Sequence, residues 1–343
     1  MREPTKPLVV LRPAPQSVDR IFTAEALAAL RAAYEVQVLD EALPDVEERF
    51  DALLPRAFAV IGQPDLPTGR LDRASELRAV LNVEGNFFPN VDYATCFARG
   101  IHVLGCGPAY ATPVAEYALG LALDLARGIS REDRAFRAGR ERYVSASTAD
   151  SILLTGADVG LVGFGNLGRA VHRLLQPFRP TVRIYDPWLP DAVVAEQGAR
   201  PSPLPELLEA SEFVFVLATV TVESEHLLGD AELDRLRPGA RLVLVSRAAV
   251  VDYDALLRRV ATGQFLAAVD VWPTEPVPPD DPARSLEGLV LSAHRAGGIP
   301  AAFASIGDMV VDDLALVARG LPPVRMQVAS RELVTRYRNR PVT

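Results

Sequence analysis

The stretch Gly163-Phe164-Gly165-Asn166-Leu167-Gly168 decides the fold of this chain. It follows the apolar run 159–162, which reads as a buried strand, and precedes the helical pattern 169–176. In such a turn the first glycine permits the tight bend, the second lets the backbone approach a ligand, and the third lets the helix pack on the strand. The pattern predicts a strand, a turn and a helix within a parallel α/β sheet.

An acidic residue points to the ligand of this turn. Asp186 ends the next apolar run, 181–185, roughly 20 residues beyond Gly165, which is the spacing of the carboxylate that binds a dinucleotide ribose. The helix after the turn directs amides and a positive dipole end at a pyrophosphate. The charge of Asp186 disfavours the extra phosphate of NADP, whereas Arg183 nearby favours it. A glycine turn without a ligand is the alternative. The sequence predicts an NAD site formed by Gly163, Gly165, Asn166, Leu167, Gly168 and Asp186.

Strand and helix patterns alternate on both sides of the turn. The downstream strand candidates are 159–162, 181–185, 213–217, 241–245, 266–270 and 289–292. The upstream strand candidates are 8–11, 36–39, 57–61, 79–83 and 102–104, with helix candidates at 23–33 and 91–99. Because such alternation favours parallel doubly wound sheets, we predict an α/β protein of two Rossmann-like domains with a cleft between them.

A long apolar helix is expected between the two halves. Thr112 suits its cap, Pro113 its first position and Glu116 its positive first turn, and the helix ends near Arg127. The arginine-rich run 128–149 predicts an exposed arm. A last helix at 301–319 is expected to return to the first domain. The predicted domains are therefore 1–108 plus 300–343, and 109–299.

Composition excludes several classes of function. The chain has 343 residues, of which 49% are hydrophobic, and its formal net charge of -8 argues against nucleic acid and anionic membrane surfaces as partners. No apolar run approaches the roughly 20 residues of a membrane span, and residues 1–15 do not resemble a signal peptide, so we expect a cytoplasmic protein. Cys96 and Cys106 form neither a metal-ligand array nor a CxxC pair, so we expect no metal and no nucleophilic thiol.

Three later segments place polar side chains just after predicted strands, where open α/β sheets bind ligands. They are Ser246-Arg247-Ala248-Ala249-Val250-Val251-Asp252, Asp270-Val271-Trp272-Pro273-Thr274-Glu275-Pro276 and Ser292-Ala293-His294-Arg295-Ala296-Gly297-Gly298. In this order and spacing, together with Val114-Ala115-Glu116, they resemble the signature segments of the D-isomer-specific 2-hydroxyacid dehydrogenases, the family of phosphoglycerate dehydrogenase. The resemblance is clearest from about Leu77 to Gly298.

The resemblance implies a reaction and the residues that perform it. It implies an oxidoreductase that moves a hydride between NAD(H) and a small 2-hydroxy or 2-keto acid, in a homodimer built around the cofactor domain. His294 is the expected general acid and base, Glu275 its carboxylate partner, and Arg247 the group that binds the substrate's carboxylate and carbonyl. The first domain would then bind the substrate and the second would bind NAD.

The chemistry of the reaction supports these residue types. A hydride that reaches a keto acid puts negative charge on the carbonyl oxygen, so a proton donor and a fixed cation lower the barrier. Histidine titrates near neutral pH, a neighbouring glutamate favours the charged ring, and arginine holds a carboxylate by two parallel hydrogen bonds. Taken singly, a structural histidine, a solvated glutamate or half of a surface ion pair explains each residue better. Their occurrence together behind an NAD site favours catalysis.

Further contacts follow from the resemblance. The cofactor contacts that it adds are Thr219, Val245, Ser246, Arg247, Asp270, His294 and Gly297. The substrate's carboxylate is expected at backbone amides of the loop after 79–83, with contacts from Glu84, Gly85 and Asn86. We interpret His102, His172 and His226 as structural or exposed. Trp272 and Tyr110 either line the pocket or pack in the core.

The residues around the arginine depart from the family pattern. Leu244 and Val245 stand where small polar residues are usual before the arginine, and Ala248 replaces the glycine after it. Leu217 and Thr219 stand where many members have histidine and proline. These changes bear on the contacts with the nicotinamide ribose and leave the arginine itself in place.

The predicted carboxylate loop, 83–92, departs most, since it is one residue longer than usual and much bulkier. Glu84 either repels a second acidic group or binds a cationic one, and Phe87 and Phe88 either form an apolar wall or point into the domain core. The substrate is therefore left open. Two alternative functions are also left open: an NAD-responsive binding protein like the family's corepressors, and a relative that acts on formate or phosphite.

Overall fold

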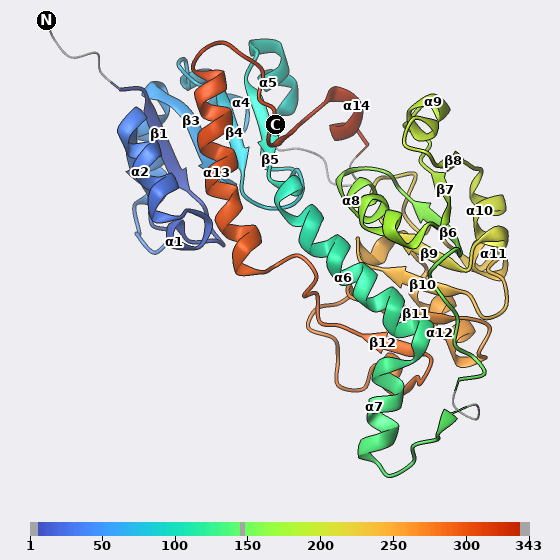
Figure 1. Ribbon diagram of the computed structural model, residues 1–343. Helices are drawn as coiled ribbons and strands as arrows, with labels where there is room; N and C mark the ends of the chain where they lie inside the picture. Colours follow the sequence, from blue (N-terminus) through green and yellow to red (C-terminus); the bar gives the residue numbers. More distant parts are fainter. Residues whose placement is uncertain (1–5, 145–147, 337–343) are drawn as a thin grey trace, which may run out of the picture. The chain divides into compact units, whose positions relative to one another are not determined.

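The computed structural model describes residues 6–144 and 148–336 and divides into two compact units. Unit 1 comprises the described residues of Met1–Tyr110 and Gly298–Thr343, and unit 2 comprises those of Ala111–Gly297. Each unit contains one sheet with helices packed on it (Figure 1). Residues 1–5, 145–147 and 337–343 lie outside the described residues, and 145–147 belong to the predicted arm.

Unit 1 is built on a sheet that has six strands among the described residues, in the order β13-β5-β4-β3-β1-β2. All neighbours pair in parallel except β13, which is antiparallel to β5. The order of the parallel strands is that of doubly wound flavodoxin-like sheets. The strands are β1 (Leu8–Arg12), β2 (Glu35–Val38), β3 (Ala57–Gly62), β4 (Ala79–Asn82), β5 (His102–Gly105) and β13 (Gln327–Val328).

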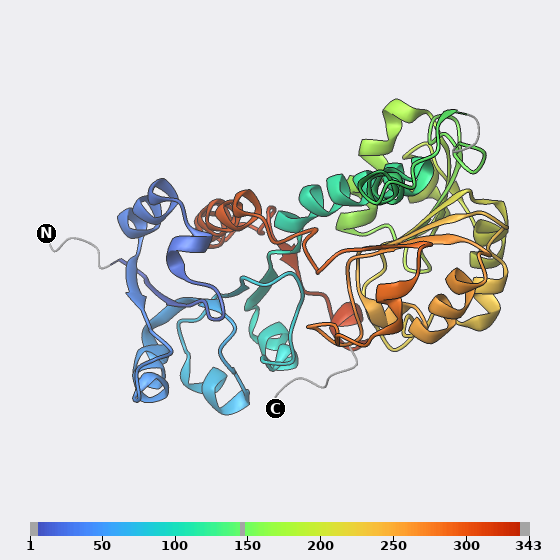
Figure 2. The same cartoon turned by 90° about the horizontal axis from the view of Figure 1, so that it is seen from below.

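Helices cover both faces of this sheet, as Figure 2 shows. The helices are α1 (Val18–Ile21), α2 (Ala24–Ala33), α3 (Val46–Leu53), η1 (Leu54–Arg56), α4 (Thr68–Arg73), α5 (Tyr93–Arg99), α13 (Pro300–Val317) and α14 (Arg331–Val334). One apolar core joins the sheet to α1, α2 and α13, and a second joins its other face to α3, α4 and α5. Burial on both faces explains why the strands are almost continuously apolar.

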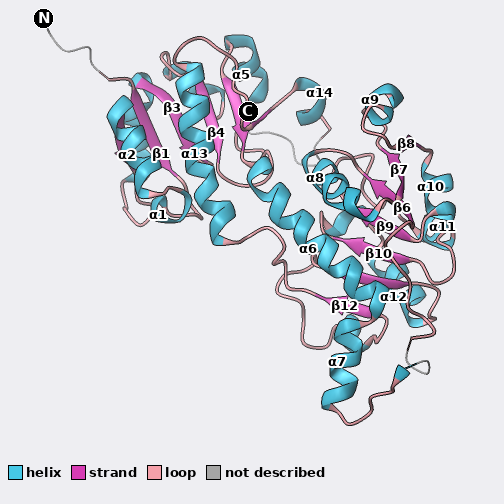
Figure 3. Cartoon of the chain, viewed as in Figure 1, coloured by secondary structure: helices cyan, strands magenta, loops and turns pink. Residues whose placement is uncertain are grey.

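Unit 2 is built on a sheet in which the described residues form seven parallel strands, in the order β12-β11-β10-β9-β6-β7-β8 (Figure 3). The chain order reverses between β6 and β9, the switch point at which such sheets bind ligands beyond the carboxyl ends of the strands. The strands are β6 (Asp158–Val162), β7 (Thr181–Tyr185), β8 (Arg200–Pro201), β9 (Phe213–Val216), β10 (Arg241–Leu244), β11 (Leu266–Val269) and β12 (Leu289–Leu291). The predicted α/β class is confirmed.

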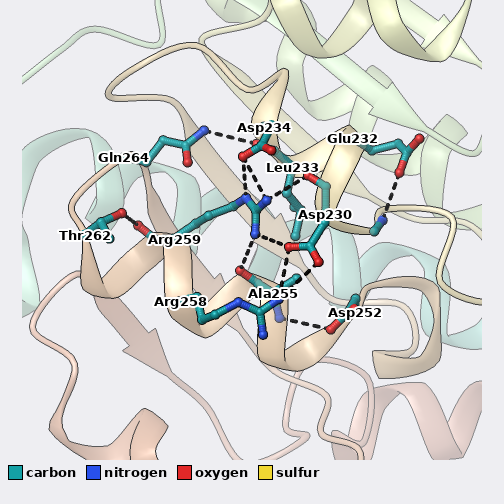
Figure 4. A network of polar contacts seen from close by, with 11 residues as sticks. Asp230, Glu232, Leu233, Asp234, Asp252, Ala255, Arg258, Arg259, Thr262 and Gln264 are labelled. Atoms are coloured by element: carbon teal, nitrogen blue, oxygen red, sulfur yellow. Dashed lines mark hydrogen bonds and ion pairs between the residues drawn. The ribbon is translucent and has the colours of Figure 1, made fainter.

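Helices connect the strands of unit 2. They are α7 (Ile129–Arg137), α8 (Asn166–Leu175), η3 (Gln176–Phe178), α9 (Asp191–Ala195), α10 (Leu204–Ala210), α11 (Asp230–Asp234), η4 (Ala248–Val250), α12 (Tyr253–Ala261) and η5 (Pro282–Ser285). Arg259 of α12 donates to Asp230 (2.6 Å) and Asp234 (2.9 Å) of α11, and Asp252 caps α12 by accepting from Ala255 N at 2.9 Å (Figure 4). This network fixes the carboxyl end of the segment 246–252, which follows β10.

The long helix α6 begins earlier than its sequence predicts. It spans Gly107–Arg127, so the predicted start at Thr112 and Pro113 is wrong, and Pro113 and Glu116 lie inside the helix. Pro108 supplies the reason, because proline is tolerated in the first turn, where its missing N–H has no helical partner. A proline inside a helix forfeits one backbone hydrogen bond, and the apolar burial of seven side chains on α6 outweighs that loss.

The segment after α6 is an exposed arm, as predicted. The helix α7 has no buried residue, and residues 138–140, 142–144 and 148–150 are exposed. Arg241, which is 4% exposed, fixes the base of the arm by donating to the carbonyls of Leu125 (2.9 Å) and Asp150 (2.7 Å). Among the described residues, no helix has both the length and the apolarity to cross a membrane.

Candidate active site

The glycine turn follows β6, and the surroundings of its three glycines differ in how much room they leave for a side chain. Gly163 has a φ of +98°, and a Cβ on it would lie 2.7 Å from the nitrogen of Ala218 after β9. A Cβ on Gly168 would overlap the carbonyl oxygen of Gly163. Gly165 meets no atom within 4 Å, so packing among the described residues does not require a glycine there. Close approach of a ligand to this backbone would require one.

Asp186 lies against the same turn. Its Oδ2 accepts from Phe164 N at 2.8 Å and its Oδ1 accepts from Trp188 N at 3.0 Å, which fixes the carboxylate beside the start of α8. Arg183, the residue that favoured NADP, is held by an ion pair with Asp158 (Nη1 to Oδ1, 2.6 Å). Asp186 thus holds a negative charge against the turn, as a site for the two ribose hydroxyls requires.

Two further features fit a bound dinucleotide. Helix α8 has Gly165 as its N-cap, which has no side chain to cap the first amides, and the positive end of the helix dipole lies at the turn, where an anion is favoured. Ser246, which is 3% exposed and follows β10, has a buried Oγ with no hydrogen-bond partner among the described residues. Buried hydroxyls without partners are costly, so this Oγ suits a group that a ligand supplies. These residues fit NAD.

His294 and Glu275 meet in unit 2, in the loops that follow β12 and β11. His294 Nδ1 lies 2.8 Å from Glu275 Oε2, and the second carboxylate oxygen accepts from Trp272 N at 3.0 Å. The side chain of His294 is 48% exposed and that of Glu275 is 37% exposed. Because Nδ1 faces the carboxylate, Nε2 is the ring nitrogen that faces away from it.

The backbone at His294 is held in an uncommon conformation. Its φ is +51°, in the left-handed region that non-glycine residues rarely adopt. Asp270, 1% exposed, holds the turn by accepting from Arg295 N (2.8 Å) and Ala296 N (3.0 Å), and its carbonyl accepts from His294 N at 2.8 Å. Strained residues that their surroundings hold in place are common at functional sites.

Two of the residues that support this turn, Ser292 and Tyr117, were not predicted as site residues. Ser292 Oγ donates to Asp270 Oδ1, and Tyr117 of α6 lies 2.7 Å from the same Ser292 Oγ. Trp272 Nε1 donates to the carbonyl of Ser292 at 2.7 Å. The one local signal was that Ser292 lies two residues before His294, whereas the contact with Tyr117 joins residues far apart in the sequence.

A cavity of about 600 Å³ opens beside the His294–Glu275 pair. Its other lining residues include Trp272, Pro276, Val277 and Leu291, so its wall is mainly apolar. An apolar wall lowers the local dielectric and strengthens the interaction of a charged histidine and glutamate. Trp272 was predicted either to line the pocket or to pack in the core. It does both in part, because the residue is 9% exposed and lines the cavity.

The remaining predicted residues of unit 2 follow the carboxyl ends of its strands. Thr219 comes after β9, and its carbonyl accepts from Ser224 Oγ at 2.6 Å. Val245 is 3% exposed, and half-buried Arg247 donates from Nη1 to the carbonyl of Ser246 at 2.6 Å. Gly297 is the last residue of unit 2.

The predicted carboxylate loop belongs to unit 1 and follows β4. Phe87 is 6% exposed, and its ring lies against Gly105 and edge-on to Tyr93, so it points into the core rather than forming a wall. Phe88 is half-buried and its carbonyl accepts from Tyr93 Oη at 2.6 Å. Half-buried Glu84 lies at the start of the loop, beside Gly85 and Asn86.

The two cysteines are buried in unit 1 and are not disulfide-bonded. Burial raises the pKa of the Cys96 thiol to about 12, and burial also raises the pKa of Cys106. Because the thiolate is the reactive form of cysteine, neither residue suits nucleophilic catalysis at neutral pH.

Known proteins resemble both units. The family model described as D-isomer specific 2-hydroxyacid dehydrogenase, NAD binding domain, matches residues 119–296, just over half of the chain. A glyoxylate reductase from Korarchaeum cryptofilum is 32% identical over 243 residues, which are 69% of this chain and 72% of that protein. A D-3-phosphoglycerate dehydrogenase from Archaeoglobus fulgidus is 27% identical over 270 residues, which are 78% of this chain and 50% of that protein.

A solved structure extends the likeness to nearly the whole chain. The crystal structure of a phosphoglycerate oxidoreductase from Rhizobium etli has a TM-score of 0.86 and 45% sequence identity, and the match covers 95% of this chain and 99% of that one. These names favour neither the corepressor reading nor the formate and phosphite reading. The chain belongs to the D-isomer specific 2-hydroxyacid dehydrogenase family and is an NAD-dependent oxidoreductase of 2-hydroxy and 2-keto acids.

Proposed function

We propose that His294, Glu275 and Arg247 carry out the proton transfer and substrate binding that accompany hydride transfer between NAD(H) and a small 2-keto acid. The observation that supports this most is the 2.8 Å contact of His294 Nδ1 with Glu275 Oε2, on a turn that Asp270 holds in place. When bound, NADH supplies the hydride that reduces the carbonyl carbon, and NAD accepts it in the reverse direction.

His294 gives a proton to the carbonyl oxygen during reduction and takes it back during oxidation. The contact of Nδ1 with Glu275 leaves Nε2 as the atom that exchanges the proton. Glu275 stabilises the charged ring and prevents it from rotating, in the manner in which a carboxylate orients a catalytic histidine. The mainly apolar cavity wall beside the pair strengthens this interaction.

Arg247 binds the carboxylate of the substrate and the oxygen on which charge develops. Its hydrogen bond to the carbonyl of Ser246 restricts the side chain before a substrate arrives. A planar guanidinium suits this role, because it offers a carboxylate two parallel donors. Unit 1 is in this proposal the substrate-binding domain, in which the backbone amides of Glu84, Gly85 and Asn86 bind the carboxylate of the substrate.

Unit 2 is in this proposal the NAD-binding domain. The pyrophosphate meets Gly165 and the amides of Asn166 and Leu167, and Asp186 binds the adenosine ribose. The support is the open face of Gly165, the glycine N-cap at the start of α8 and the buried Oγ of Ser246, which has no partner among the described residues. The further cofactor contacts are Gly163, Gly168, Thr219, Val245, Arg247, Asp270, His294 and Gly297.

Replacement of the two cationic residues tests the proposal. We expect His294→Ala to lower kcat for NADH oxidation with a reactive 2-keto acid by about 10²–10⁴, because general acid catalysis contributes that much. We expect Arg247→Ala to raise KM and lower kcat, and Arg247→Lys to recover little, because lysine has no bidentate fork. NADH fluorescence should report a Kd for His294→Ala that changes far less than kcat, because most of the proposed cofactor contacts lie elsewhere.

The matched controls are His226→Ala and Arg237→Ala, which alter exposed residues of the same unit. Both controls should retain wild-type turnover. Turnover that persists in His294→Ala and in Arg247→Ala would contradict the assigned roles.

We also propose that the protein is a cytoplasmic homodimer. The support for a dimer is the arm, which exposes the apolar side chains Ile129 (59%), Phe136 (62%), Tyr143 (70%), Val144 (81%) and Leu153 (67%). Exposed apolar clusters of this kind mark interfaces. The support for the cytoplasm is the pair of unbridged thiols and the use of NAD(H).

A further inference from the structure

The carboxylate of Glu84 is fixed at the start of the loop after β4. Its Oε1 accepts from Gln16 Nε2 at 2.7 Å, and Gln16 lies in the connection between β1 and α1. Two neighbouring loops at the carboxyl edge of the unit 1 sheet are thereby joined. The side chain is half-buried, so water screens its charge less than it screens a surface carboxylate.

The charge of Glu84 is not neutralised by a cation. Among the described residues Glu84 forms no ion pair, and the amide of Gln16 that bonds it is neutral. Arg20, whose charge acts on Tyr110, lies with its guanidinium over the ring of Phe303 at 3.8 Å. The carboxylate of Glu84 is thus hydrogen-bonded to an amide at this edge of the sheet and is not part of an ion pair among the described residues.

The field of Glu84 reaches the side chains around the loop. Burial raises the pKa of Tyr110, and the charge of Glu84 raises it further, whereas Arg20 lowers it. Burial likewise raises the pKa of Cys106, and Glu84 adds to that effect. Tyr110 borders the loop itself, because a Cβ on Gly85 would lie 3.3 Å from its ring. A group bound at this loop therefore lies between a negative charge and an aromatic wall.

We propose that Glu84 is a specificity residue that rejects 2-keto acids carrying a second negative charge and admits those whose substituent is uncharged, such as a hydroxymethyl group. The inference rests on the proposed binding of the substrate carboxylate by the amides of residues 84–86. The first carboxylate is compensated there by those amides. A second anion has no such partner and lies within reach of Glu84.

The size of the effect follows from the charges. Two like charges roughly 6 Å apart, in surroundings of effective dielectric constant about 20–40, repel enough to lower binding by about tenfold or more. A neutral hydroxyl of the substrate escapes this repulsion and donates a hydrogen bond to the carboxylate instead. Discrimination of this kind comes from a repulsive element as well as an attractive one.

The test compares hydroxypyruvate with 3-phosphohydroxypyruvate in NADH oxidation by the full-length protein. The wild type should show a kcat/KM at least about tenfold higher for hydroxypyruvate, and Glu84→Gln should narrow that ratio about tenfold. The substitution conserves size and removes the charge, so any effect of phosphate size cancels when the two ratios are compared. Glu48→Gln is the matched control, because it removes one exposed carboxylate from α3, and it should leave the ratio unchanged.

A second measurement uses the wild type alone and does not depend on the folding of a variant. Raising the salt concentration from about 0.1 M to about 1 M shortens the Debye length from about 10 Å to about 3 Å, so the ratio should narrow. A ratio in Glu84→Gln within twofold of the wild type, or a wild-type preference for the phosphorylated acid, overturns the inference and leaves the proposed function standing. If the wild type turns over neither these acids nor glyoxylate, the proposed function falls and the inference falls with it.

Discussion

His294 and His172 lie in the same unit in opposite environments. The side chain of His294 is 48% exposed and meets a carboxylate, whereas His172 is 7% exposed and meets none. Phe164 packs edge-on to the His172 ring, with 5.7 Å between the centroids, and Gln176 Nε2 lies 3.0 Å from its Nε2. An amide nitrogen only donates, so the ring nitrogen accepts and the ring is neutral. His172 was predicted to be either structural or exposed, and its burial confirms the structural alternative.

The burial of His172 makes stability depend on pH. Burial lowers its pKa below 6.5, so between about pH 6.5 and that lower value the unfolded chain binds the additional proton. The contribution of His172 to stability is therefore complete above pH 6.5 and is lost as the pH falls through this range. Urea unfolding of the wild type and of His172→Gln at about pH 7.5 and 5.5 should give a smaller loss of free energy at low pH for the variant.

His226→Gln is the control for this measurement, since His226 is exposed. Its loss of stability between the two pH values should equal that of the wild type. Equal losses in the wild type and in His172→Gln would show that the buried ring does not govern acid sensitivity in this range.

Sequence patterns predicted residue types at the site better than their contacts. The pairing of Glu275 with His294 was predicted from the family resemblance, and chemistry supports it, because a carboxylate orients a catalytic histidine. The destination of Phe87 did not follow, because the alternation of a strand ends at Asn82 and a loop side chain obeys no period. The contact of Tyr117 with Ser292 was equally inaccessible, since it depends on how α6 packs on the sheet.

Gly165 and Gly168, which lie where β6 leads into α8, make a matched pair for substitution. Gly165→Ala should leave the melting temperature of the free protein nearly unchanged, because the added Cβ meets no atom within 4 Å. It should weaken NADH binding tenfold or more, since the methyl group occupies the side from which the pyrophosphate approaches. Gly168→Ala should destabilise the protein by about 1–3 kcal/mol, because the methyl group overlaps the Gly163 carbonyl oxygen and pushes α8 off β6.

Thermal unfolding and NADH fluorescence titration together distinguish the two variants. Loss of stability without loss of NADH affinity in Gly165→Ala would place the ligand away from this turn. Unchanged stability in Gly168→Ala would mean that helix and strand pack less closely than the backbone indicates.

Element boundaries were predictable where periodicity is long. The strands β6 and β7 and the helix α13 lie within one or two residues of their predicted bounds. The short helices α1, α3 and α4 were not predicted, because four to eight residues rarely display a helical period. The start of α6 was misplaced because Thr112-Pro113 imitates a helix start, whereas the tertiary burial of Val114 and Ala115 continues a helix already begun.

At the scale of the whole molecule, the exposed arm predicts the assembly state. Ile129 and Phe136 are seven residues apart on α7 and so lie on one face of the helix. The mass measured by light scattering should be about twice the 37.1 kDa of one chain, because this face is covered in a dimer. Phe136→Asp should shift the protein toward monomer at low concentration, since it introduces a charge at that interface.

Val324→Asp is the control, because Val324 is 71% exposed and belongs to unit 1, whereas the arm belongs to unit 2. It should leave the mass unchanged. A wild-type protein that is monomeric at micromolar concentration would refute the proposed dimer without affecting the chemistry assigned to His294.

The alternation of strands and helices predicted two parallel sheets, and both are observed. The pairing of β13 with β5 was not predicted, because a strand of two residues carries no pattern of its own. Glycines and charged residues at strand ends predicted where ligands would bind, because the carboxyl edge of a parallel sheet is set by topology. The identity of a substrate depends instead on single side chains of loops, such as Glu84, whose directions no sequence period specifies.

Unit 1 is formed by two separate stretches of the chain, which affects how the protein folds during synthesis. One face of its sheet, including Ile61, Leu81 and Leu104, is covered by α13, and β5 is paired by β13. Both covering elements are synthesised after all of unit 2. During synthesis the sheet of unit 1 therefore keeps apolar surface exposed until α13 and β13 have been made. Unit 2 is continuous in sequence and is able to fold before that. The amino-terminal part of a nascent chain of this protein is accordingly the part that most needs a chaperone.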